Sequence, residues 1–152
     1  MPAPAQHRPA PGSVRRDFNL LFLVMLVIAS GNTALQSVLP AIGRSFGLPD
    51  TLIAFSFSLS ALIWMLLAPA WARLSDRHGR KAMVMLGLGG FTVSLTSSAI
   101  AFSAGIAGWL SAGMTFLAFV TGRLIYGALG SAAPPAAQAL VAARTNHDAR
   151  TR

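Results

Sequence analysis

The sequence contains no cysteine and no glutamate, and only 11% of its 152 residues carry charged side chains. Without cysteine the chain forms no disulfide, has no thiolate nucleophile and offers no thiolate ligand to a metal. The four acids are Asp17, Asp50, Asp76 and Asp148. They leave little material for a pair of catalytic carboxylates or a carboxylate metal site. We therefore expect no enzyme activity, no metal and no cofactor.

The small number of charged residues also indicates whether lipid or water surrounds the protein. Soluble domains have roughly 25% charged residues, whereas this chain has few of them and is 54% hydrophobic. A net charge of +8 would suggest nucleic acid as the partner of a soluble protein. Here the basic residues fall between apolar runs, so we expect the partner to be a lipid bilayer and not nucleic acid.

Four mostly apolar stretches are each long enough to cross a membrane, which takes about 20 helical residues. They cover about 18–40, 51–72, 83–102 and 109–134. Because lipid tolerates only internally bonded backbone, each should be a helix. The sequence therefore predicts an all-α membrane protein with a four-helix segment at 17–143, a disordered basic tail at 1–16 and a truncated loop at 144–152.

The orientation follows from the basic residues, which are enriched on the cytoplasmic side of membranes. Ten of the twelve lie in the tail, in the second connector or after the fourth stretch, whereas Arg44 alone lies in the other two connectors. This predicts a multi-pass protein of the inner (plasma) membrane with both chain ends in the cytoplasm. A twin-arginine export signal at Arg15 and Arg16 is the alternative reading of the N-terminus, but the apolar run that follows is too long for a cleavable signal.

The second connector contains the most specific motif. Residues 72–81 read Ala-Arg-Leu-Ser-Asp-Arg-His-Gly-Arg-Lys. They resemble the signature G-x-L-a-D-r-x-G-r-k between helices 2 and 3 of the major facilitator superfamily. The matching residues are Leu74, Asp76, Arg77, Gly79, Arg80 and Lys81, and Ala72 replaces the first glycine.

Within this motif, Gly79 can adopt the positive φ that reverses the chain. Arg80 and Lys81 would hold the next helix at anionic headgroups. Asp76 is an acid in a basic cluster, and the resemblance implies that it contacts the positive N-terminal end of a helix in the other half of the transporter. There it would act as a gating latch. The alternative is a surface ion pair with Arg73 or Arg80, worth under about 1 kcal/mol.

The fourth stretch is similar to another motif of the same family, an intramembrane arginine followed four residues later by glycine. Arg123 and Gly127 match it, and Tyr126 stands where glutamine is common. The resemblance links the arginine to proton coupling, although by charge alone it could equally attract an anionic substrate group. No acid lies in the four stretches, so we expect a proton-binding carboxylate, if protons are coupled, beyond residue 152.

Arg123 lies about 14 residues, or roughly 20 Å, from the outer end of its stretch. A charge at such depth costs about 2.5–3.5 kcal/mol and usually faces the bundle interior. Asn32 lies near the same level of the first stretch, with Gln36 one turn further out. We expect the guanidinium to donate to the Asn32 side chain or to a nearby backbone carbonyl. The alternative is that Arg123 extends to the inner headgroups as an anchor.

The resemblance covers about residues 18–152 and is nearest to drug:H⁺ antiporters of the tetracycline and multidrug efflux type. It implies a proton-coupled exporter of drug-like or amphipathic small molecules that works by alternating access of two six-helix halves. We expect this chain to be an N-terminal fragment, inactive without the missing C-terminal helices. Two alternatives stay open: a non-transporting four-helix membrane adaptor, and a small dimeric multidrug transporter, whose usual membrane glutamate is absent.

Overall fold

The computed structural model describes residues 11–139, and these form helices joined by short turns. The helices are α1 (Pro11–Ser45), α2 (Asp50–His78), α3 (Arg80–Ile106) and α4 (Ala112–Ile125), and α4 continues into the π-helix η1 (Tyr126–Gly130). Residues 133–139 are again helical. Four segments are long and apolar enough to cross a membrane. The predicted all-α architecture with four membrane-crossing helices is confirmed.

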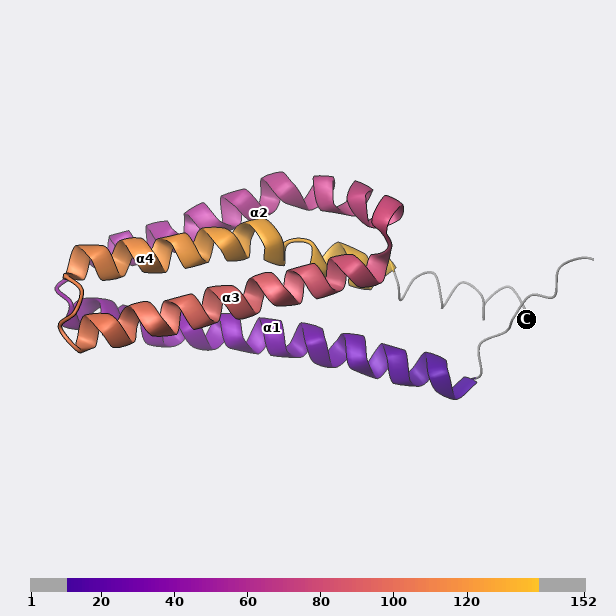
Figure 1. The fold of residues 1–152 in the computed structure, drawn as a ribbon, viewed down its shortest axis with the longest axis horizontal. Helices are drawn as coiled ribbons and strands as arrows, with labels where there is room; N and C mark the ends of the chain where they lie inside the picture. Colours follow the sequence, from indigo (N-terminus) through magenta and orange to yellow (C-terminus); the bar gives the residue numbers. More distant parts are fainter. Residues whose placement is uncertain (1–10, 140–152) are drawn as a thin grey trace, which may run out of the picture.

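The helices run up and down in a bundle (Figure 1). The α1–α2 and α3–α4 turns lie at one end, and the α2–α3 turn lies at the other end together with both termini of the described chain (Figure 1). Among these helices, α3 packs most extensively against α4 and η1, whereas α1 has fewer contacts with α2 and α3. The bundle therefore has a tight α2–α3–α4 core with α1 laid against it.

The first helix is longer than predicted at both ends. It begins at Pro11, so residues 11–16 are helical although the whole segment 1–16 was expected to be disordered; residues 1–10 lie outside the described part. Proline is compatible with the first turn of a helix, where its missing N–H has no helical partner anyway. The helix also passes through Pro40 to Ser45, because one proline removes a single backbone bond, which is tolerated in membrane helices.

The α2–α3 connection is much shorter than the expected connector at 73–82. The chain reverses at Gly79, with φ of +91°, and its N–H donates to the Ser75 carbonyl at 3.1 Å. A Cβ there would meet no atom within 4 Å, so the backbone dihedral is what requires glycine. Residues 73–78 and 80–82 are helical because charged residues are good helix formers once they lie beyond the apolar run.

The fourth membrane segment begins and ends later than predicted. Ser111 caps α4 by accepting a hydrogen bond from the Met114 N–H at 3.3 Å, so the helix begins at Ala112 and not near residue 109. Pro134 and Pro135 were expected to end it. Instead a turn at 131–132 is followed by a new helical segment, and these prolines fall in its first turn, where missing N–H groups do no harm.

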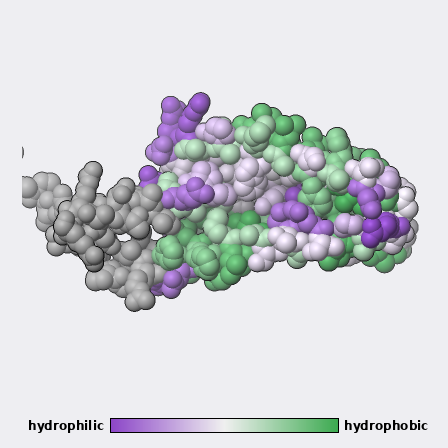
Figure 2. All heavy atoms as spheres, turned by 180° about the vertical axis from the view of Figure 1, so that it is seen from behind, coloured by the Kyte–Doolittle hydropathy of each residue, from purple (hydrophilic) through white to green (hydrophobic). Residues whose placement is uncertain are grey.

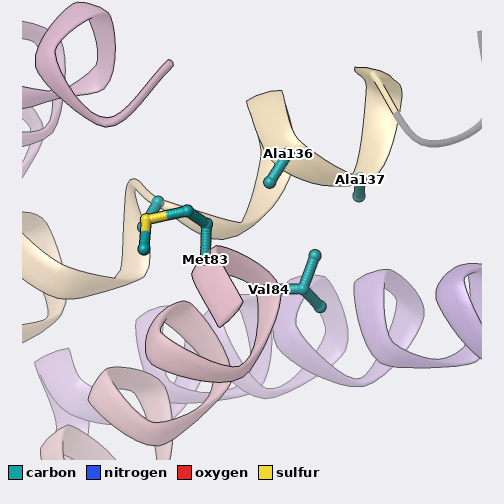
Figure 3. Close-up of a cluster of buried hydrophobic side chains, with 5 residues drawn as sticks. Met83, Val84, Ala136 and Ala137 are labelled. Atoms are coloured by element: carbon teal, nitrogen blue, oxygen red, sulfur yellow. The ribbon is translucent and has the colours of Figure 1, made fainter. Parts of the chain in front are cut away.

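Small residues allow α3 and the end of the fourth segment to approach closely. Met83 and Val84 of α3 are buried against Ala136 and Ala137 (Figure 3). Gly87 continues this contact, since a Cβ there would lie 2.5 Å from Ala133 Cβ and 2.7 Å from the Ala133 backbone nitrogen. Membrane helices pack in this way because lipid offers no hydrophobic drive for their association.

The outer surface is largely apolar. Figure 2 shows hydrophobic side chains over much of one face, with hydrophilic patches at the ends of the bundle and another part-way along it. Exposed side chains include Phe22, Phe55, Leu66, Ile100 and Leu117. Such a surface suits acyl chains and not water.

The two ends of the bundle can be distinguished by labelling. Because the chain has no cysteine, His78→Cys and Ala107→Cys each introduce a single thiol at an exposed position, one at each end. We expect a membrane-impermeant maleimide to label Ala107→Cys in intact cells and His78→Cys only after lysis. Labelling of His78→Cys in intact cells would contradict the predicted topology.

The close approach at Gly87 predicts a stability difference between two glycines of the same helix. Gly87→Ala should lower the free energy of unfolding by about 1–3 kcal/mol because the methyl overlaps backbone atoms. Gly89→Ala is the matched control, since a Cβ there meets nothing within 4 Å, and it should be neutral or slightly stabilising. Detergent-solubilised variants unfolded with sodium dodecyl sulfate and followed by tryptophan fluorescence provide the comparison; equal midpoints would refute the packing argument.

Candidate functional site

A cleft of about 490 Å³, mostly apolar with a few polar groups, opens between α1, α2 and the junction of α4 with η1. It is lined by Asn32, Gln36, Phe57, Ser58, Ser60, Ala61, Trp64, Arg123 and Tyr126. Nearly all of these residues lie well inside the apolar segments. A concave site with a few convergent polar groups among aromatic walls is the usual form of a small-molecule site.

Arg123 is the central residue of this cleft. It lies in the last turn of α4 and is only 4% exposed. Its Nη1 donates to Asn32 Oδ1 at 2.9 Å, which is the contact expected from the depths of the two residues in their helices. The guanidinium therefore faces the bundle interior and does not extend to the inner headgroups. Gln36 lines the same cleft, and no hydrogen bond between it and Arg123 is formed in the described chain.

Aromatic rings complete the surroundings of the guanidinium. Its Cζ lies 4.5 Å from the Phe57 ring centroid and 4.9 Å from that of Tyr126. A desolvated cation over such rings gains on the order of 2 kcal/mol. Trp64 packs on Tyr126 with the ring centroids 5.4 Å apart. These contacts offset part of the cost of a charge at this depth.

The backbone of Arg123 is held by α2. Ser60 Oγ donates to the Arg123 carbonyl at 2.8 Å. Gly127 makes this approach possible, because a Cβ there would lie 2.5 Å from the Ser60 carbonyl oxygen. The neighbouring serines behave differently: Ser56 and Ser58 donate back to carbonyls of their own helix. Of the three, Ser60 alone ties α2 to the arginine.

The π-helix η1 begins three residues after Arg123, at Tyr126. Trp71 Nε1 donates to the Ala128 carbonyl at 2.7 Å. The indole N–H of α2 therefore replaces the backbone N–H that would bond this carbonyl in a regular helix. Single π-turns occur frequently at functional sites. The sequence analysis missed η1, and the signal that could have indicated it is Pro134-Pro135, two residues without N–H donors just beyond it.

The 72–81 motif lies apart from the cleft, at the end of the bundle that carries the α2–α3 turn. Asp76 is 16 residues beyond Ser60 on the same helix, or roughly 24 Å. Asp76 is exposed, and no ion pair to Arg73 or Arg80 is formed among the described residues. Arg80 instead donates from Nη1 to the Ala139 carbonyl at 2.6 Å, which caps the last described turn of the fourth segment.

The other members of that motif have plain surroundings. Leu74 is half-buried and packs against the core cluster around Met83. Ala72, Arg77 and Lys81 are exposed. The structure thus brings together Arg123, Asn32, Gln36 and Gly127 at one level, and leaves the motif residues as a separate group at the bundle end.

Comparison with known proteins identifies the family. A family model described as Major Facilitator Superfamily matches residues 21–152. This chain belongs to that superfamily. Members of the Major Facilitator Superfamily are membrane transporters and not enzymes, and the four apolar helices agree with a multi-pass membrane protein.

A relative among curated superfamily members is the "Multi-drug resistance efflux pump PmrA homolog" of Lactococcus lactis subsp. lactis (strain IL1403). It is 29% identical over 114 residues, an alignment that covers 72% of this chain. The chain spans only 27% of the length of that pump. No solved structure matches the chain.

The side chains that line the cleft, apart from Ala61, are basic, amide, hydroxyl and aromatic. In residues 11–139, no group of three or more His, Cys, Asp or Glu side chains is placed to hold a metal ion. None of the nine lining residues is an acid. What the site offers is one guanidinium, two amides, hydroxyls and three aromatic rings, which are groups suited to holding a ligand.

The Arg123–Asn32 hydrogen bond predicts a stability effect with an internal control. Asn32→Ala should lower the free energy of unfolding by about 1–2 kcal/mol, because the buried guanidinium loses its acceptor. Gln36→Ala removes an amide from the same cleft that does not bond Arg123, and should change stability by less than about 0.5 kcal/mol. In an Arg123→Gln background, Asn32→Ala should cost much less. An undiminished loss there would mean that Asn32 stabilises the fold independently of Arg123.

Proposed function

We propose that this chain provides part of a proton-coupled exporter of drug-like or amphipathic small molecules, and that the Arg123 cleft is its contribution to the substrate site. The observation that carries the proposal is the burial of Arg123, 4% exposed, in an open cleft at mid-depth of the bundle. Transporters of this kind bind their substrates near the bilayer midplane. A charge kept at such depth is a functional site by default.

The relative supports export as the direction of transport. That protein is named a multidrug resistance efflux pump, and the aromatic walls of the cleft suit the amphipathic compounds that such a name implies. Arg123 would contribute to coupling by favouring deprotonation of a nearby acid, while remaining charged itself. That acid would come from outside the four membrane segments, since the lining residues include none.

Asp76 would serve as the gating latch at the cytoplasmic end. Its carboxylate is exposed at the end of α2 and so is free to meet the positive end of another helix. Arg80 is engaged with the Ala139 carbonyl and forms no ion pair with Asp76, which is the acid of the motif. The proposed orientation puts this end, and both termini, on the cytoplasmic side of the plasma membrane.

We further propose that transport needs helices in addition to these four, because alternating access requires two halves that rock around the site. The chain by itself, reconstituted in liposomes with an imposed pH gradient, should not move fluorescein, an amphipathic dye with an aromatic carboxylate. Saturable, gradient-driven flux by the 152-residue chain would overturn this.

A chimera tests the transport function directly. The part of the Lactococcus pump that aligns with this chain is replaced by it, and the unaltered pump serves as the positive control for dye efflux. We expect the chimera to export the dye, to stop when nigericin collapses the pH gradient, and to lose at least about 90% of the rate on Arg123→Gln. Thr121→Ala, a change at an exposed residue of the same helix, should leave the rate unchanged. A chimera present in the membrane but inactive, or active with Arg123→Gln, would contradict the proposal.

A further inference from the structure

The positive charge in the cleft has no negative partner in the described chain. The contacts of the Arg123 guanidinium are the neutral Asn32 amide and the rings of Phe57 and Tyr126. The ion pair formed among the described residues is Arg44–Asp50, whose side chains are 60% and 61% exposed. That pair lies in the α1–α2 turn, at the end of the bundle, and so cannot serve Arg123.

The acids of the helices are all distant from this level. Measured along the helices, Asp50 is ten residues from Ser60, or roughly 15 Å, and Asp76 is roughly 24 Å from it in the other direction. Asp17 precedes Asn32 by 15 residues, or roughly 22 Å. A carboxylate must come within about 4–6 Å to balance a charge effectively. The part of the cleft formed by residues 11–139 therefore keeps a net positive charge.

The guanidinium also has unused donors. It carries five N–H groups, of which the described contacts use the one that points to Asn32. Its Nε is buried and has no hydrogen-bond partner. A planar guanidinium with free N–H groups matches a carboxylate, which can accept two of them side by side. A cationic ligand would find no acceptor of opposite charge among the lining residues.

The rest of the cleft is shaped for a flat apolar body. Trp64 and Tyr126 lie against each other, and the guanidinium lies over the rings of both Tyr126 and Phe57. Aromatic side chains bind rings by offset or edge-to-face contacts. A ligand that carries an anionic group on an aromatic ring would satisfy both the charge and the walls.

From this geometry we propose that the Arg123 cleft selects amphipathic organic anions, with aromatic carboxylates as the defining class. The inference rests on the proposed function, in which the cleft is part of the substrate site. It narrows the broad class of drug-like molecules to those that bring the missing negative charge with them.

Binding of three probes with the same ring tests this selectivity. The full chain is placed in phosphatidylcholine nanodiscs and titrated with 4-nitrobenzoate, neutral 4-nitrobenzyl alcohol and cationic 4-nitrobenzylammonium, whose nitro groups quench tryptophan. We expect the Kd of the carboxylate to be at least about tenfold lower than that of the alcohol, and the ammonium to bind most weakly. Trp64→Phe should remove most of the saturable quenching, which locates the probe in the cleft. Empty nanodiscs give the contribution of lipid.

Variants then assign the preference to its residue. Arg123→Gln should abolish the advantage of the carboxylate over the alcohol, and Arg123→Lys should keep part of it because the charge remains. Arg44→Gln removes an exposed arginine at the bundle end and should change nothing. The inference is overturned if the alcohol or the ammonium binds as tightly as the carboxylate, or if Arg123→Gln retains the preference. Either result would mean that Arg123 takes its counter-charge from protein and not from a ligand.

The outcome is separable from that of the proposed function. A carboxylate preference in the chain together with a chimera that fails to export dye would support the anion site and refute transport. Export by the chimera together with equal binding of the three probes would support transport and refute the anion site.

Discussion

The arrangement of the site depends on the need to stabilise one buried positive charge, that of Arg123. Arg123 is 4% exposed inside an apolar bundle, where an uncompensated charge costs several kcal/mol. Its neighbours each reduce that cost: Asn32 accepts a hydrogen bond, and two aromatic faces cover the guanidinium. Ser60 fixes the backbone that carries it. These groups come from α1, α2 and the fourth segment, so the position of one side chain constrains how three helices pack.

The small residues of α3 and the fourth segment are what allow this arrangement to exist. Gly127 lets Ser60 reach the Arg123 carbonyl, and Gly87 lets Ala133 sit against α3. A methyl group at either position would push helices apart by more than a hydrogen bond can stretch. Without a hydrophobic drive between helices in lipid, such contacts and a few interhelical hydrogen bonds carry most of the packing energy. Gly127 is thus required because α2 lies too close for a side chain, and not because its backbone needs an unusual dihedral angle.

Much of the fold and of the site could be predicted from the sequence, because hydropathy and depth in the membrane depend on position along the chain. The four crossings and the meeting of Arg123 with Asn32 follow from counting residues along apolar runs, and the reversal at Gly79 follows from the freedom of glycine to adopt a positive φ. What could not be counted is the rotation of each helix about its axis. That rotation decides that Ser60, and not Ser58, reaches α4, that Trp71 donates to the Ala128 carbonyl, and that Arg80 donates to the Ala139 carbonyl. Helix ends were also underestimated, since polar residues beyond the apolar run remain helical.

The break in the fourth segment has a mechanical meaning. Between η1 and residues 133–139 the backbone ladder is interrupted by a turn and two prolines, so little stiffness is transmitted along the helix axis at that point. Residues 133–139, beyond the break, are held from the side by the Arg80 hydrogen bond to the Ala139 carbonyl and by the contact of Ala133 with Gly87. These residues are therefore attached to α3 by side contacts, and only weakly to the helix that precedes them. Any tilt of α3 would carry residues 133–139 with it, because the interrupted backbone transmits little stiffness from η1 to this piece.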